Sequence, residues 1–371
     1  MPSTSISSPR ILLLSAYDAA SHKRWRTQLM AALPEMHWHT LVLSPRYFSW
    51  RIRGNALSWF QHPQLRESWD LLICTSMVDL AGLRGLHPHL AKTPALLYMH
   101  ENQFAFPDSG RQHKSYEPQM INLYSALSAE QILFNSEWNR RSFIEGASAL
   151  LKKLPDEIPV GLMDHIFEKS SILPVPIEDE LFAVRERPIH HTQPHLLWNH
   201  RWEYDKGPDR LAYFLDALLE RKQDFSLSLV GEQFRKQPEA FQCIRERHAE
   251  RIVNWGFMAD VSEYRRLLTQ ADVVLSTALH DFQGLSMLEA MAAGCIPYAP
   301  KRLAYPEYIK APFLYASELN EPIKEAEQAA DQFVQLWQQP LELRCQIRGV
   351  YRNCCLSIVP PSRLCFNEEG K

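Results

Sequence analysis

The chain has 371 residues, of which 46% are hydrophobic and 22% charged, so its composition excludes disordered, collagen-like and fibrous proteins and predicts two globular domains. Forty Lys and Arg against 43 Asp and Glu give a net charge of −3, which excludes a globally basic nucleic-acid-binding protein. No apolar run reaches the length of a membrane span and the first residues lack the order of a secretion signal, so we expect a cytoplasmic protein.

Short apolar runs alternate with helix-length segments along most of the chain. We expect strands in the first half at 11–15, 39–43, 71–75, 95–100 and 131–135. The alternation breaks in the proline-rich stretch Pro174–Pro194 and then resumes, with strands expected at 195–199, 225–230, 251–255, 272–277 and 296–299. Such spacing is typical of βαβ units and a parallel sheet.

The break between the two alternating halves predicts the domain organisation. We expect an α/β fold of two Rossmann-like, doubly wound domains that face each other across a cleft, over residues 1–180 and 195–345. Residues 181–194 are expected to be a linker, and 346–371 a C-terminal tail. Open parallel sheets bind ligands beyond the carboxyl ends of their strands, so functional residues are expected there.

The most informative segment runs from His280 to Pro297 and predicts a loop, a helix and a strand. Gly284 precedes the helix-forming residues and Gly294 is placed to end the helix in a left-handed conformation. Glu289 falls on the packing face of this helix, so it needs a base, backbone donors or a ligand diol as partner, or else an internal salt bridge. Asp281 is placed either to cap the helix or to serve a ligand, and the amides from Gly284 to Ser286, Leu285 included, predict an anion site.

Two further segments place polar side chains at strand ends. Arg201 and Lys206 follow the strand at 195–199, where a guanidinium fork and a mobile ammonium could hold a diphosphate, although surface charge is the alternative. His100 ends the strand at 95–100 and is either a hydrogen-bonded structural histidine or a site residue. The seven cysteines are scattered and the histidines lack metal-ligand spacing, so we expect reduced thiols, no metal and no cofactor.

These segments together resemble the retaining GT-B glycosyltransferases of family 4, in which an E-x7-E element enters a helix of the second domain. Asp281 and Glu289 occupy the two positions of that element here, with the first carboxylate shortened. The resemblance implies that Glu289 holds the nucleotide ribose and Asp281 faces the donor sugar. It also implies that Arg201 and Lys206 neutralise the diphosphate and that His100 contacts the sugar near the anomeric carbon.

A closer likeness, over roughly residues 10 to 310, is to the tRNA-queuosine α-mannosyltransferase family. Five segments carry it, namely Ser15–Lys23, Tyr98–Pro107, Phe134–Ser136, Asn199–Lys206 and Ser276–Gly284. The resemblance implies mannose transfer from GDP-mannose to queuosine in a tRNA anticodon (tRNA-Asp), with retention of configuration. It implies a nucleotide sugar in the second domain, and His22, Lys23 and Asn102 on the acceptor side in the first. The chain departs from the family at Ala19-Ala20, where two glycines are usual, and in its tail.

Three interpretations of the acceptor remain open. Residues 10–53 carry seven Lys or Arg against two acids, with Trp25, Trp38, Tyr47, Phe48 and Trp50 interleaved, which favours an RNA acceptor although structural aromatics explain the rings equally well. A family 4 enzyme with a lipid, glycan or small-molecule acceptor is the second interpretation. A non-catalytic protein that binds a sugar nucleotide or RNA is the third. The sequence leaves the oligomeric state undetermined.

Overall fold

The computed structural model describes residues 8–105, 115–154, 156–182 and 193–339. The chain forms two compact units that divide between Val175 and Pro176, within the proline-rich stretch singled out above. Most of the predicted linker 181–194 and all of the predicted tail 346–371 lie outside the described residues. No helix in the described part of the chain has the length and apolar character that crossing a membrane demands.

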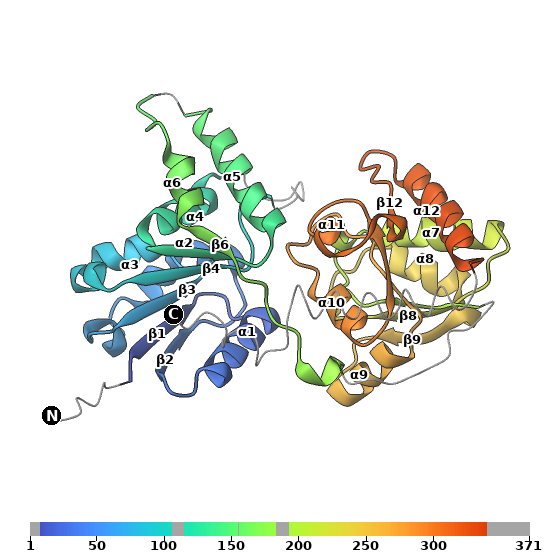
Figure 1. The fold of residues 1–371 in the computed structure, drawn as a ribbon, viewed down its shortest axis with the longest axis horizontal. Helices are drawn as coiled ribbons and strands as arrows, with labels where there is room; N and C mark the ends of the chain where they lie inside the picture. Colours follow the sequence, from blue (N-terminus) through green and yellow to red (C-terminus); the bar gives the residue numbers. More distant parts are fainter. Residues whose placement is uncertain (1–7, 106–114, 155, 183–192, 340–371) are drawn as a thin grey trace. The chain divides into compact units, whose positions relative to one another are not determined.

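The first unit is a parallel six-stranded sheet in the order β2-β1-β3-β4-β5-β6, flanked by helices (Figure 1). Its elements are β1 Arg10–Ser15, α1 Ala20–Ala32, β2 His37–Val42, α2 Phe48–Trp59, β3 Leu71–Thr75, α3 Leu80–Leu86, β4 Ala95–Met99, α4 Glu117–Ser128, β5 Gln131–Phe134, α5 Glu137–Leu151, α6 Leu162–Glu168 and β6 Ser170–Ile172.

The second unit repeats this architecture with the order β12-β11-β10-β7-β8-β9, again all parallel. Its elements are β7 His195–Trp198, α7 Pro208–Glu220, β8 Ser226–Val230, α8 Ala240–Arg247, β9 Ile252–Gly256, α9 Val261–Gln270, β10 Val273–Leu275, α10 Leu285–Ala292, β11 Ile296–Pro300, α11 Tyr305–Tyr308, β12 Leu314–Tyr315 and α12 Pro322–Trp337. Short 3₁₀ turns include Asp179–Phe182 and Tyr204–Lys206.

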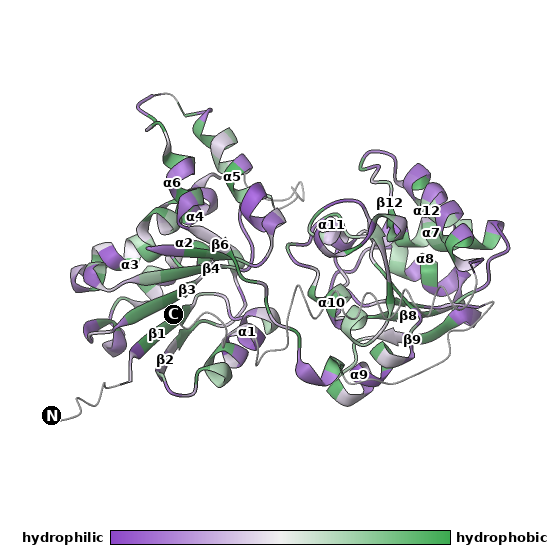
Figure 2. Cartoon of the chain, viewed as in Figure 1, coloured by the Kyte–Doolittle hydropathy of each residue, from purple (hydrophilic) through white to green (hydrophobic). Residues whose placement is uncertain are grey.

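The central strands are largely apolar because helices cover both faces of each sheet. Leu12, Leu13 and Leu14 of β1 are almost completely buried, as expected for a strand with neighbours on both sides and helices on both faces. Figure 2 shows the hydrophobic residues concentrated on such strands, whereas the helices carry hydrophilic residues as well. The α/β prediction is confirmed, and all ten predicted strands are present. The edge strands β6 and β12 were not predicted because they hold only three and two residues.

Candidate active site

The carboxyl ends of β7, β8 and β10 bring the polar segments of the second unit together. These strands are neighbours in the sheet, and the backbone after β7 runs against the end of β8, where Trp202 N donates to Glu232 O (2.9 Å). Gly231 makes this approach possible, because a Cβ there would lie 1.8 Å from the His200 carbonyl oxygen and its φ is +151°. The ends of β7 and β8 are thereby held together.

Lys206 lies at the centre of this edge and is buried. Its Nζ donates to the His280 carbonyl oxygen at 2.7 Å and lies 3.3 Å from Asp205 Oδ2 and 3.6 Å from Asp281 Oδ2. Burial is the largest influence on the pKa of the Asp281 carboxyl and would raise it, but Lys206, His200, His280 and the Gly284 amide together hold that pKa below its ordinary value. The sequence predicted a mobile charge at Lys206, whereas the structure shows an ammonium already paired with two carboxylates.

Arg201 is the more accessible of the two predicted cations. Its side chain is 48% exposed and its guanidinium lies 2.8 Å from Glu203. Asp205 Oδ2 lies 4.0 Å from its Nη2 as a second carboxylate. An exposed guanidinium still keeps donors for a further anion, because it carries five N–H groups in a planar fork. Arg201 is therefore accessible to a phosphate, whereas the buried Lys206 orients Asp281.

The start of α10 differs in one respect from the predicted anion site. Asp281 Oδ1 accepts a hydrogen bond from the Gly284 amide at 2.9 Å, so that amide is occupied and the prediction for it was wrong. The amides of Leu285 and Ser286 have no acceptor among the described residues, as the geometry of a helix start requires. Gly284 precedes the helix with φ +77° and Gly294 follows it with φ +100°, which confirms the predicted ends.

Glu289 of α10 has a partner that the sequence did not reveal. Tyr264 of α9 donates its hydroxyl hydrogen to Glu289 Oε2 at 2.9 Å, and the same hydroxyl oxygen accepts from Asn199 Nδ2 at 3.0 Å. Asn199 Nδ2 also donates to the Ser286 carbonyl oxygen. The carboxylate is therefore oriented by a chain of hydrogen bonds that begins at the end of β7.

His200 is a buried histidine at the same edge. Its Nδ1 lies 3.3 Å from Ser286 Oγ, while its Nε2 has no hydrogen-bond partner among the described residues. Burial first, and then the Lys206 charge, lowers the pKa of His200 to about 4. The ring is consequently neutral at physiological pH.

In the first unit, His22 and His100 meet at the carboxyl end of β4. The two rings stack with centroids 4.1 Å apart, and both side chains are buried. His22 Nε2 lies 3.0 Å from Glu101 Oε2, and Ser76 Oγ donates to Glu101 Oε1 at 2.8 Å. Burial first, and then His22, lowers the pKa of His100 well below its ordinary value. Glu101 was not predicted from the sequence to be a site residue, although it directly follows His100.

The other predicted acceptor-side residues have different environments. Lys23 is exposed in the first turn of α1. Asn102 is completely buried, and its side chain donates to Asn139 and Ser142 and accepts from the Phe104 amide. In this structure Asn102 therefore orders the loop after β4, and its assignment to the acceptor stays a prediction.

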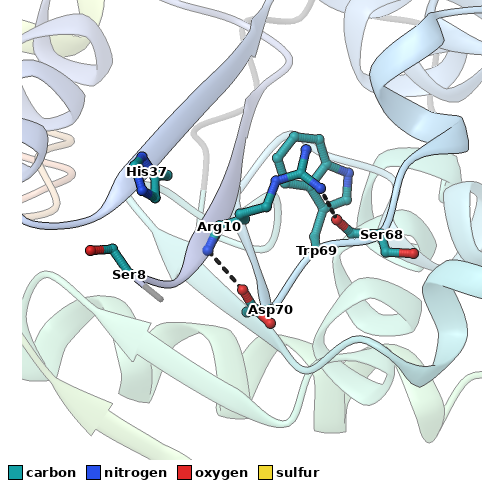
Figure 3. A pocket seen from close by; sticks show the side chains of 6 residues that line it. All are labelled: Ser8, Arg10, His37, Ser68, Trp69 and Asp70. Carbon is teal, nitrogen blue, oxygen red and sulfur yellow. Dashed lines mark hydrogen bonds between the residues drawn. The ribbon is translucent and has the colours of Figure 1, made fainter. Parts of the chain in front are cut away.

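A surface cavity near the beginning of β1 does not belong to this site. It is lined by Ser8, Arg10, His37, Ser68, Trp69 and Asp70 (Figure 3). Arg10 donates its amide hydrogen to Asp70 and a guanidinium hydrogen to the Ser68 carbonyl oxygen, and it lies over the Trp69 ring. The cavity is at the amino ends of the strands, opposite the edge at which such sheets bind ligands.

Comparison with known proteins identifies the family. A family model described as the N-terminal part of tRNA-queuosine alpha-mannosyltransferase matches residues 10–177, and the model of group 1 glycosyl transferases matches residues 180–348. The tRNA-queuosine alpha-mannosyltransferase of Drosophila melanogaster is 33% identical over 319 residues, which cover 84% of each chain. The chain belongs to the tRNA-queuosine α-mannosyltransferase family.

Solved structures show the GT-B fold for this member of the tRNA-queuosine α-mannosyltransferase family. Sucrose-phosphate synthase from Thermosynechococcus elongatus superposes with a TM-score of 0.69 at 14% identity, covering 95% of both chains. HepE from Anabaena, solved with UDP and glucose, gives a TM-score of 0.64 at 14% identity, again over 95% of both chains. The predicted GT-B architecture of a glycosyltransferase is thus confirmed.

The contact between Gly231 and His200 predicts a measurable loss of stability. Gly231→Ala places a Cβ against a backbone oxygen, so something must shift, and we expect the free energy of unfolding to fall by about 1–3 kcal/mol or more. Urea denaturation measures the change. Gly85→Ala is the matched control, because a Cβ at Gly85 has no atom within 4 Å and alanine is favoured in a helix. Equal stability of both variants would contradict the assigned contact.

The buried His200 predicts a loss of stability in mild acid. Its pKa is about 4 in the folded chain and 6.5 in the unfolded chain, so the unfolded state binds the proton first as the pH falls from 6.5 towards 4. We expect the free energy of unfolding of the wild type to decrease as the pH falls across that window. The free energy of unfolding of His200→Gln should decrease by about 3 kcal/mol less over the same window. Urea midpoints at several pH values measure the difference, and identical pH profiles would contradict the account.

Proposed function

We propose that this chain transfers mannose from GDP-mannose to the queuosine of a tRNA anticodon, with retention of anomeric configuration. The observation that carries the proposal is the relationship to the Drosophila tRNA-queuosine alpha-mannosyltransferase over 84% of the chain. The match of the first unit to the N-terminal model of the same family supports the acceptor, because that unit carries the part of the enzyme peculiar to the family.

The arrangement at the edge of the second unit suits a departing nucleoside diphosphate. As the glycosidic bond breaks, negative charge develops on the β-phosphate and is stabilised by fixed donors. The exposed Arg201 guanidinium and the Leu285 and Ser286 amides are such donors. Glu289, oriented by Tyr264, would accept from the ribose hydroxyls, and Asp281, oriented by Lys206, would face the sugar.

The transfer we propose is a same-face substitution through an oxocarbenium-like state. The bond from the anomeric carbon to the phosphate oxygen breaks, the acceptor oxygen bonds to that carbon, and the leaving phosphate takes the acceptor proton. His100 would contact the sugar, and His22 and Lys23 would lie towards the acceptor. We propose that no metal ion takes part, and equal rates with and without EDTA would support this.

The decisive experiment uses labelled GDP-mannose and total tRNA with or without queuosine. We expect label only in the queuosine-containing tRNA, together with a mobility shift on boronate gels. Label in tRNA that lacks queuosine, or in a lipid or glycan instead, would replace the proposed acceptor. Absence of transfer to any acceptor, with binding of GDP-mannose retained, would indicate a non-catalytic protein.

Loss of the accessible guanidinium should slow the reaction. For Arg201→Ala we expect kcat/KM for GDP-mannose to fall on the order of 10²-fold, because one donor to the developing phosphate charge is removed. Arg247→Ala is the matched control, since Arg247 is an exposed, ion-paired arginine of the same unit. Steady-state kinetics provide the measurement, and equal rates for the two variants would show that the diphosphate is held elsewhere.

Loss of the Tyr264 hydroxyl should weaken donor binding without damaging the fold. Tyr264→Phe keeps the ring but removes the hydrogen bond to the Glu289 carboxylate, so we expect KM for GDP-mannose to rise about ten-fold with a smaller effect on kcat. Tyr213→Phe, at a half-exposed tyrosine of α7, is the control. An unchanged KM, or a fall confined to kcat, would contradict the assigned role.

A further inference from the structure

An exposed group of aromatic and basic side chains lies at the carboxyl edge of the first sheet. Tyr47 is 72% exposed, Trp50 51% and Tyr116 58%. Tyr47 and Trp50 belong to the start of α2, and Tyr116 precedes α4. Both helices begin after the carboxyl end of a parallel strand, as α1 does, so this surface shares its sheet edge with His22 and His100.

Direct contacts connect this surface to the loop that leads into α1. Phe48, the first residue of α2, packs edge-on against Tyr17 with ring centroids 5.6 Å apart. The Asp18 amide donates to the Leu43 carbonyl oxygen at 2.9 Å. The loop after β1, which leads to His22, and the loop after β2, which leads to Tyr47, are therefore bound to each other.

Trp50 is held as a flat platform. A Cβ at Gly54 would lie 2.6 Å from Cη2 and Cζ2 of the Trp50 indole, so the ring lies along α2 where the missing side chain leaves room. Half of the side chain remains open to solvent. A ring fixed in this way can stack with another planar group at a small entropic cost, because its own freedom is already reduced.

Tyr47 has an unusual backbone. Its φ is +55° and its ψ is +53°, a left-handed conformation that is uncommon for a bulky residue. Strained conformations of this kind cluster at active sites and ligand-binding sites. The conformation presents the tyrosine ring to solvent directly before α2, with the Arg46 guanidinium 5.9 Å from the ring centroid.

The charge of this surface is positive. Residues 43–60 contain three arginines and no acid. The Arg53 guanidinium is paired with Glu117, which cancels one charge, while Arg51 donates to Ser44 through two of its five N–H groups. Arg46 and Arg51 therefore leave two positive charges beside the exposed rings.

We propose that Tyr47, Trp50 and Tyr116, with Arg46 and Arg51, form the surface on which unstacked bases of the acceptor RNA loop dock. The proposal rests on the RNA acceptor proposed above. Bases of a single-stranded loop stack on aromatic rings and their phosphates pair with arginines. The surface satisfies both requirements and adjoins the predicted acceptor-side residues.

The test measures binding of a fluorescein-labelled anticodon stem-loop RNA to the full chain by anisotropy. We expect Trp50→Ala and Tyr47→Ala each to weaken binding about ten-fold or more, and Trp50→Phe to keep most of the affinity. Arg46→Ala should lower the salt dependence of log Kd by about 0.7. Phe60→Ala, at an exposed aromatic of the other end of α2, is the matched control, and melting curves show that each variant is folded.

The outcomes separate this proposal from the proposed function. Three results would contradict the proposed docking surface. They are wild-type affinity in Trp50→Ala and Tyr47→Ala, an equal loss of affinity in Phe60→Ala, and no binding of the RNA by the wild type. If Trp50→Ala transfers mannose to tRNA with an unchanged KM for tRNA, the proposed docking surface is wrong and the proposed enzyme activity is supported. If RNA binding depends on Trp50 but no tRNA receives mannose, the surface stands and the proposed reaction is wrong.

Discussion

The pairing of the Lys206 ammonium with Asp205, Asp281 and the His280 carbonyl oxygen holds the candidate site of the second unit together. A buried ammonium is tolerated only when its charge is compensated, and removing one partner of such a group usually costs 3–5 kcal/mol. The loop after β10 is therefore fixed to the turn after β7. Asp281, which caps the start of α10 through the Gly284 amide, lies in that attached loop.

The buried and the exposed charges of the site therefore have different roles. Lys206 and its two carboxylates carry one net negative charge, so they do not form an anion site by themselves. The amides of α10 and the exposed Arg201 supply the donors that a diphosphate needs. In the first unit the stacked His22 and His100 rings are similarly buried, and Glu101 fixes the orientation of His22.

The sequence was sufficient to predict the fold and where along the chain the site residues lie. It was not sufficient to predict which side chains form hydrogen bonds or ion pairs with one another. The central strands and the ends of α10 follow from local patterns, such as apolar runs and the glycines at 284 and 294. The pairing of Glu289 with Tyr264, and of His22 with Glu101, depends on which strands are neighbours and on side-chain packing between distant segments. Lys206 was expected to be mobile because nothing local indicates that the turn after β7 is buried under the loop after β10.

A crystal structure of the chain with bound GDP would test the central claim most directly. The account predicts that the β-phosphate lies against Arg201 and the first amides of α10, while Lys206 Nζ keeps its contact with Asp281. A diphosphate bound away from this edge, or a lysine turned out towards solvent with Asp281 displaced, would contradict it.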